Sequence, residues 1–215
     1  MLIIEILRQH KRNQVLGATL GEALISNARP QLLQSSPPSA DQIVILDFLG
    51  IKDTNSSYLK ATFVWLLLCG ELSASEQTMT RGLADDADEG DPFKPIPLNV
   101  FPLVAHLSRN VSQELDELLN GRKLPCLEAI TWTKDRVISA RLHGYLDEPL
   151  SRTFSNLIES GSGTATQLQA QYPEMITPNA WSNRLLELYR LRLIQRHKES
   201  REWIYQPVAK ELING

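Results

Sequence analysis

Runs of apolar residues along the first half of the chain alternate with stretches in which apolar positions recur at helical spacing. Residues 2–7 and 43–48 are short apolar runs, and the second is continuous, as in a strand buried on both faces. Residues 16–25 repeat apolar positions on one helical face, and residues 57–69 carry the apolar excess of a largely buried helix. The order strand, turn and helix predicts an α/β layer structure.

The same alternation continues in the middle of the chain with a further strand, a helix and a hairpin. Residues 100–107 are mostly apolar and predict a strand, and residues 111–119 have the amphipathic repeat of a helix. Residues 126–133 and 136–145 flank a short polar turn, and the second segment alternates polar and apolar positions. We therefore expect these two segments to pair as a β-hairpin.

The last third of the chain changes to three helical repeats followed by a second hairpin. Thr164 with Gln167 has the spacing of a capping box, and Thr177 with Pro178 is another helix start signal. The predicted elements are helices over residues 149–160, 165–172 and 178–193, then strands over residues 194–197 and 203–208.

This change of pattern divides the chain into two predicted domains, residues 1–146 and 147–215. Within the first domain, residues 71–98 are interpreted as an acidic loop that ends in a proline-rich stretch. Its acidic residues include Asp85, Asp86, Asp88, Glu89 and Asp91. Two interpretations stay open, a solvated insertion or a decoy for a basic surface.

Three helices followed by a two-stranded wing is the element order of a winged helix-turn-helix domain. On the third helix, Trp181, Leu185 and Leu188 share one face, which should point to the core. The segments TPNAWSNRLLELYRLRLIQR at residues 177–196 and REWIYQP at residues 201–207 resemble bacterial winged-helix transcriptional regulators.

This resemblance implies an α+β winged-helix domain that lies on double-stranded DNA. The major groove of B-DNA, about 12 Å wide, admits a helix whose amide side chains read base edges, while cations on the wing hold phosphates. The implied DNA contacts are Asn179, Ser182, Asn183 and Arg190 on the helix and Lys198 and Arg201 on the wing.

The charge balance restricts how the chain could bind DNA. The net charge is −3 and the isoelectric point about 5.8, so DNA binding must depend on a local patch. From Arg184 to Glu202 the segment holds six Lys/Arg against three Glu.

Winged helices also dock on proteins, and Glu187 on the outward face would repel phosphate. The alternative is therefore a non-enzymatic adaptor or partner-switching protein in a signalling or defence complex.

The N-terminal domain has a second, shorter resemblance. Residues 46–51 (LDFLGI) and 54–59 (TNSSYL) are similar to the STAS-like family, which is related to anti-sigma-factor antagonists. The resemblance implies an α/β STAS-like domain in which Ser56 or Ser57, at a helix start, is a regulatory switch. The alternative interpretation is that the two serines only cap the helix.

Motifs for catalysis or metal binding are missing from the sequence. There is no P-loop, no HExxH and no GxSxG, and neither Cys69 nor Cys126 has the spacing of a zinc site. We interpret His143, which lies near Arg141 in a strand-like segment, as a core or surface histidine. We expect no catalytic residues, no metal, no cofactor and no enzymatic activity.

The sequence also predicts the cellular location of the protein and its function. The first residues lack the layout of a signal peptide, and the most apolar run, residues 61–69, is too short to span a bilayer. We therefore expect a cytoplasmic protein with no membrane contact. Its predicted function is transcriptional regulation, in which the winged helix reads duplex DNA under the control of the STAS-like domain. That control would act through a protein partner, a ligand or self-association as a dimer.

Overall fold

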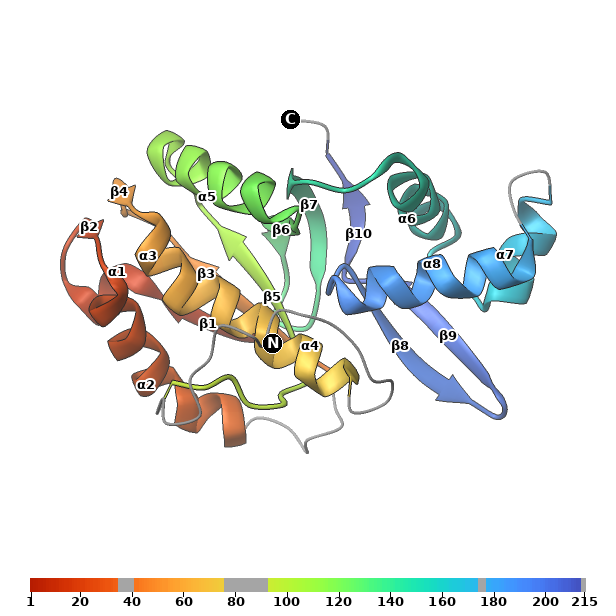
Figure 1. Cartoon of the computed structure of the whole chain (residues 1–215), viewed down its shortest axis with the longest axis horizontal. Helices are drawn as coiled ribbons and strands as arrows, with labels where there is room; N and C mark the ends of the chain where they lie inside the picture. Colours follow the sequence, from red (N-terminus) through yellow and green to blue (C-terminus); the bar gives the residue numbers. More distant parts are fainter. Residues whose placement is uncertain (35–40, 76–92, 174–176, 214–215) are drawn as a thin grey trace.

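The computed structural model describes residues 1–34, 41–75, 93–173 and 177–213 (Figure 1). It has a mixed α/β fold built on a largely parallel sheet, so the α/β layer structure expected for the N-terminal part is confirmed. The acidic residues from Asp85 to Asp91 lie outside the described residues, so both interpretations of that loop stay predictions.

The central sheet has six strands in the order β1-β3-β5-β6-β7-β10. β1, β3, β5 and β6 run parallel to one another, β7 is antiparallel to β6, and β10 is parallel to β7. The strands are β1 (Leu2–Glu5), β3 (Gln42–Asp47), β5 (Val100–Ala105), β6 (Pro125–Trp132), β7 (Val137–Gly144) and β10 (Ala209–Leu212). Strands of adjacent parallel βαβ units need long connections, which the helices provide.

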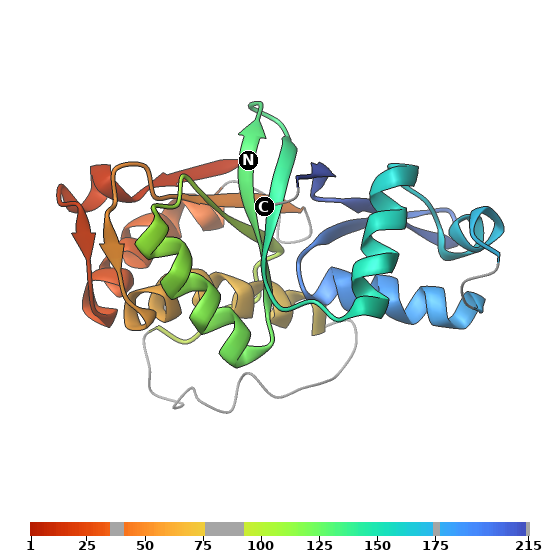
Figure 2. The same ribbon diagram turned by 90° about the horizontal axis from the view of Figure 1, so that it is seen from above.

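Helices α2 (Ala18–Gln34), α4 (Trp65–Ser75) and α5 (Arg109–Arg122) cover one face of this sheet (Figure 2). They share a core with strand residues such as Val44, Leu46 and Val104. On the opposite face of the sheet, the side chains of Ile45 and Leu103 pack in a second core. This core continues into the C-terminal part of the chain. Both faces of β3 and β5 are therefore buried, as the continuous apolar runs predict.

The helix predicted over residues 57–69 is longer and less regular than expected. It consists of α3 (Ser56–Leu59), a π-helical turn η1 (Lys60–Val64) and α4. The backbone of α2 approaches this turn at Gly21, where an added Cβ would lie 2.7 Å from the Cβ of Ala61. Glycine is required there because any side chain would push the two helices apart.

Three short elements complete the N-terminal part. Helix α1 (Ile6–His10) follows β1, and strands β2 (Gln14–Val15) and β4 (Asp53–Thr54) form a separate parallel pair. His10 Nε2 lies 3.2 Å from the hydroxyl of the buried Tyr58. These contacts hold the loops at the carboxyl end of the sheet.

A buried ionic network links α5 to the β6–β7 hairpin. His143 lies between two carboxylates, with Nε2 3.0 Å from Glu128 and Nδ1 3.0 Å from Asp116. Arg141 lies 3.3 Å from the same Glu128 carboxylate. Burial lowers the pKa of His143, but the hydrogen bonds and charges of Glu128 and Asp116 outweigh it, so its pKa is raised. Of the two interpretations that the sequence left open, His143 is therefore the core histidine, and its imidazolium form donates to both carboxylates.

The C-terminal part contains three helices and a hairpin in the predicted order. These are α6 (Glu148–Ser160), α7 (Ala165–Gln171), α8 (Pro178–Arg190), β8 (Ile194–Glu199) and β9 (Glu202–Pro207). Thr164 and Gln167 form the predicted capping box, and the side chain of Thr177 caps α8. A bridge between Gly163 and Tyr205 joins the α6–α7 connection to the hairpin.

The final strand β10 was not predicted, and it returns the chain to the central sheet. Ala209 pairs with Val137 of β7, and Leu212 pairs with Ala140. The C-terminal helices share one core with the sheet, since Phe154 and Trp181 belong to the same cluster as Ile43. Residues on the two sides of the predicted boundary at 146 and 147 therefore contribute to one sheet and one core.

Candidate nucleic-acid interface

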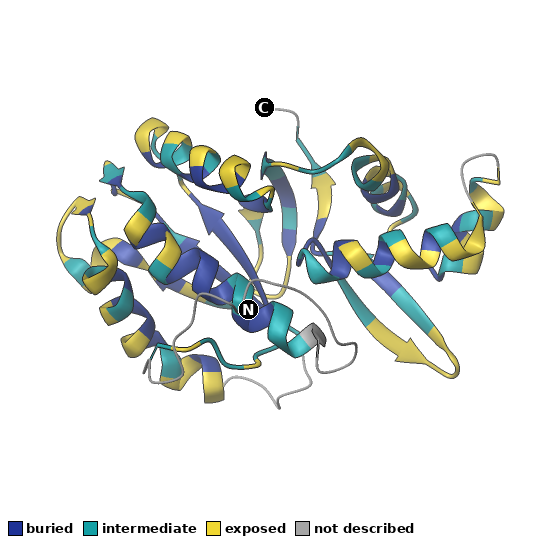
Figure 3. Cartoon of the chain, in the orientation of Figure 1, coloured by how far each residue is buried: buried dark blue, intermediate teal, exposed yellow. Residues whose placement is uncertain are grey.

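The N-terminal half of α8 presents polar side chains to solvent. Asn179, Ser182 and Asn183 are exposed, and none of them has a hydrogen-bond partner in the described part of the chain. Exposed and buried positions alternate along α8 (Figure 3). The opposite face of α8 buries Trp181, Leu185, Leu188 and Tyr189. The helix is thus fixed by its apolar face, and the three predicted base-reading residues lie together on its free face.

Arg190, the fourth predicted helix residue, stands apart from this group. It lies in the last turn of α8, about 16 Å along the helix axis from Asn179 at the usual rise per residue. Its guanidinium is 3.6 Å from the carboxylate of Glu187 one turn earlier. Arg190 is therefore separated from the other three predicted helix residues and is paired with Glu187.

The two predicted wing residues lie at the tip of the β8–β9 hairpin. Lys198 and Arg201 are both exposed, and Ser200 between them turns the chain with a φ of 56°. Glu199 and Glu202 are exposed at the same tip, where they are paired across the hairpin. The tip therefore carries both signs of charge.

The cationic excess expected between Arg184 and Glu202 is smaller on the surface than in the sequence. Arg192 is 2% exposed, and Arg196 stacks between the rings of Tyr189 and Trp203, 4.2 Å from each ring centre. The remaining cations are Arg184, Arg190, Lys198 and Arg201, against Glu187, Glu199 and Glu202. Two of the six cations therefore serve packing, and the local excess of positive charge predicted from the sequence is correspondingly small at the surface.

Arg192 joins the C-terminal end of α8 to the central sheet. Its Nη1 donates to Asn99 Oδ1 at 3.0 Å, and its guanidinium carbon lies 4.9 Å from the ring centre of Phe101. Asn99 in turn donates to Asp41, which precedes β3. Burial raises the pKa of Asp41 and lowers that of Arg192. Sequence reasoning missed this contact because arginines are mostly exposed unless they are paired.

The predicted regulatory serines lie at the start of α3. Ser57 is exposed and Ser56 is partly exposed. The cap of this helix is Asn55, whose Oδ1 accepts the amide N–H of Tyr58 at 3.1 Å and that of Gly17 at 3.0 Å. The interpretation that the serines cap the helix is therefore wrong, and their predicted role as a switch stays a prediction.

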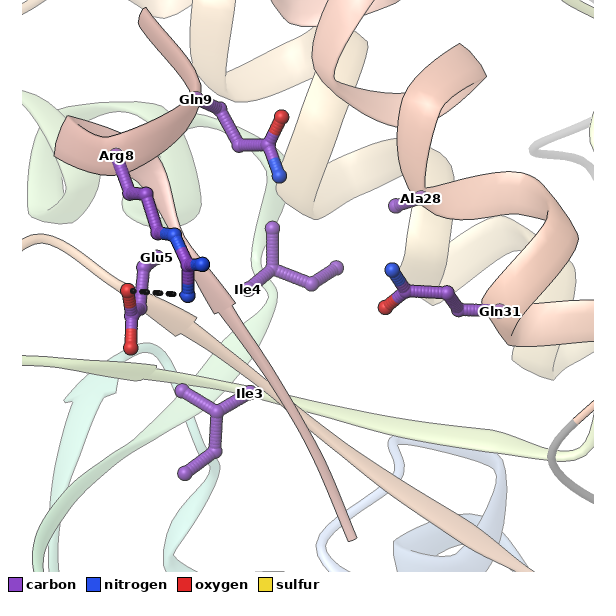
Figure 4. Close-up of a pocket in the computed structure, with 7 residues that line it drawn as sticks. All are labelled: Ile3, Ile4, Glu5, Arg8, Gln9, Ala28 and Gln31. Carbon is purple, nitrogen blue, oxygen red and sulfur yellow. Dashed lines mark ion pairs between the residues drawn. The ribbon is translucent and has the colours of Figure 1, made fainter. Parts of the chain in front are cut away.

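Among the residues that the structure describes, the outer edge of β1 has no partner strand. β1 is the first strand of the sheet, and a cavity of about 290 Å³ opens between it, α1 and α2 (Figure 4). Ile3 is 39% exposed there, and Arg8 lies 3.7 Å from Glu5. An unpaired strand edge is where a second chain can pair, so the predicted self-association has a candidate surface here.

A second cavity, about 470 Å³ in volume, lies between the β6–β7 hairpin and the β8–β9 hairpin. It is lined by the exposed cations Arg136 and Lys210 and by the amides of Gln195 and Gln206. Ligand sites often occur where two parts of a chain meet. The predicted control by a ligand has a candidate place here.

Neither a group of metal-ligating side chains nor a helix that could span a membrane is found among the described residues. They contain no group of three or more His, Cys, Asp or Glu side chains placed to hold a metal ion. Cys69 and Cys126 are free and buried, and burial raises the pKa of both thiols. Across the same residues, every helix is too short or too polar to cross a membrane.

Comparisons with protein-family models, with curated proteins and with solved structures gave no match.

Proposed function

We propose that the chain is a cytoplasmic DNA-binding regulator whose α8 enters the major groove of double-stranded DNA. The observation that carries the proposal is the free face of α8, where Asn179, Ser182 and Asn183 are exposed and unpaired. Amide side chains can bond adenine in two places, and a helix fits the groove. The buried stripe on the other side of α8 would hold this face in a fixed orientation.

The arrangement around α8 supports a winged-helix assignment for the C-terminal part. Three helices precede the β8–β9 hairpin, and the Gly163–Tyr205 bridge ties the first helical connection to it. In this proposal Lys198 and Arg201 contact phosphates beside the groove. The STAS-like assignment of residues 1–146 rests on the sequence resemblance, and this part would control DNA binding through a partner, a ligand or self-association.

The near balance of charge on the surface of α8 and the wing favours a second candidate function, an adaptor that docks on a protein. Four surface cations against three carboxylates give a weak field for a polyanion. A genomic-fragment selection with the purified chain at near-physiological salt separates the two. Enrichment of a shared sequence supports DNA reading, and no retention favours the adaptor.

We expect Lys198→Ala combined with Arg201→Ala to weaken binding to all DNA sequences alike. Each phosphate contact that is lost means that fewer counterions are released on binding. The plot of log affinity against log salt concentration should therefore become less steep by about 2. Fluorescence anisotropy over a salt series measures this slope. Lys52→Ala with Lys60→Ala removes two exposed cations far from the wing and should leave the slope unchanged. An unchanged slope in the wing variant would contradict the proposed docking.

Asn183→Ala should change sequence preference rather than overall affinity. The loss is expected to be about 1–3 kcal/mol at one base pair, since a bidentate amide contact discriminates by that amount. Competition binding with single-base variants of the selected site measures it. The control is Asn120→Ala, an exposed asparagine at the end of α5. Equal losses on all sequences would place Asn183 on the backbone instead of the bases.

A further inference from the structure

An Asp–His pair lies at the carboxyl ends of β3 and β5, far in sequence from the proposed DNA interface. Asp47 is the last residue of β3, and His106 directly follows Ala105, the last residue of β5. The two strands are neighbours, with Asp47 opposite Ala105. In open α/β sheets, ligands and reacting groups gather at the carboxyl ends of the parallel strands.

The imidazole of His106 is held on two sides. Asp47 Oδ1 lies 2.8 Å from His106 Nδ1, and it also accepts the amide N–H of Leu49 at 2.9 Å. The ring of Trp132 lies against the imidazole, with centroids 5.3 Å apart and planes at 58°. The Leu49 amide fixes the carboxylate, and the carboxylate together with Trp132 fixes the ring.

This geometry leaves Nε2 of His106 free and reactive. When the neutral imidazole donates its Nδ1 proton to Asp47, the lone pair is on Nε2. Nε2 has no partner in the described part of the chain, and the His106 side chain is 42% exposed, against 12% for Asp47. A carboxylate that accepts the Nδ1 proton keeps the imidazole in one tautomer and one orientation.

The backbone at His106 adds a separate observation. Its φ is +54°, in the left-handed region that non-glycine residues rarely adopt. Such strain persists where the surrounding structure holds it, and it gathers at functional sites. Here the unusual φ turns the chain out of β5 so that the imidazole meets the end of β3.

We propose that His106 is a phosphoryl-acceptor site, whose Nε2 takes a phosphoryl group from a nitrogen–phosphorus donor such as a phosphohistidine on a partner protein. A metal site is less suited to this pair, since the described residues supply no third His, Cys, Asp or Glu ligand. The exposed Nε2 is accessible to a donor carried by another protein. This proposal does not depend on DNA binding.

The transfer balances without a further reactant. The Nε2 lone pair forms a bond to phosphorus while the P–N bond of the donor breaks. The electron pair of that bond stays on the departing nitrogen, which takes up a proton from the surrounding water. The Nδ1 proton remains in its hydrogen bond to Asp47, which offsets the positive charge that develops on the ring.

Phosphoramidate, a small nitrogen–phosphorus donor, tests the proposal on the full chain. We expect mass spectrometry at neutral pH to show His106 phosphorylated at least roughly tenfold faster than His197, because a carboxylate partner changes histidine reactivity by that order. His197 is the matched control, since it is exposed on β8. Phosphorus NMR should show the Nε2 isomer, and His106→Gln should remove that signal.

Two variants of Asp47 test its role as a positioning residue. Asp47→Asn keeps an oxygen for the Nδ1 proton but loses the charge, so the rate at His106 should fall by roughly tenfold with the isomer unchanged. Asp47→Ala frees Nδ1, so the Nδ1 isomer should appear as well. In both variants the rate at His197 should stay the same, which shows that the effect is confined to His106, and an unchanged circular dichroism spectrum shows that the fold is intact. Equal rates at His106 and His197 in the unaltered chain, or no effect of Asp47→Asn, would overturn the proposal.

Discussion

Replacing Trp181 with alanine is expected to lower the free energy of unfolding by about 3–5 kcal/mol, as other buried tryptophan truncations do. Trp181 is fully buried in the core that joins α8 to α6, α7 and the sheet, and its ring lies 6.1 Å from that of Tyr172. The truncation leaves a cavity that the helices around it can close only in part. Urea denaturation followed by circular dichroism measures the loss.

Two further variants separate the packing of Trp181 from its polar group. The indole Nε1 is buried without a hydrogen-bond partner among the described residues. Trp181→Phe removes that N–H and keeps most of the apolar volume, so it should cost much less than the alanine variant. Ser182→Ala, the exposed neighbour, should change stability by less than about 0.5 kcal/mol. A small effect of Trp181→Ala would mean that α8 is not held by this core.

The second large effect is expected from Glu128→Gln in the buried ionic network. Glu128 and His143 are 7% and 6% exposed, and removing one partner of such a pair typically costs about 3–5 kcal/mol because the other charge is left buried. Chemical denaturation near pH 6 measures the loss. Glu117→Gln, an exposed glutamate on α5, is the control and should have little effect.

The same network predicts how stability depends on pH. The folded pKa of His143 is raised, so its contribution is full below the unfolded value of about 6.5 and is lost as the pH rises through the folded pKa. Burial raises the pKa of Glu128, but His143, the Leu107 amide and Arg141 outweigh it and lower the pKa overall. The contribution of Glu128 is therefore lost as the pH falls through that lowered value. In His143→Gln the decline of stability above about pH 6.5 should be weaker than in the unaltered chain.

The order of most helices and strands was predictable because it depends on local patterns. The stripe of Trp181, Leu185 and Leu188 predicts which face of α8 is buried, and Thr164 and Thr177 mark the helix starts correctly. The exposure of Asn179 and Asn183 follows from the same periodicity. These features can be predicted because they depend only on residues that are close to one another in the sequence.

The features that the sequence did not predict depend on contacts between distant residues. β10 is short and contains Lys210 and Glu211, so only its pairing with β7 makes it a strand. The burial of Arg192 depends on Asn99, which is remote in sequence. Likewise the pair of Asp47 and His106 forms only when β3 and β5 lie side by side.

The return of β10 to the sheet means that the C-terminal helices are tethered at two points. The chain leaves the sheet after β7, forms α6 to β9, and re-enters the sheet beside the same strand β7 (Figure 1). A unit attached in this way cannot swing as freely as one on a single linker. Any reorientation toward a partner would be restricted to a hinge near β7, and a fragment cut after residue 146 would leave the backbone edge of β7 unpaired and prone to aggregation.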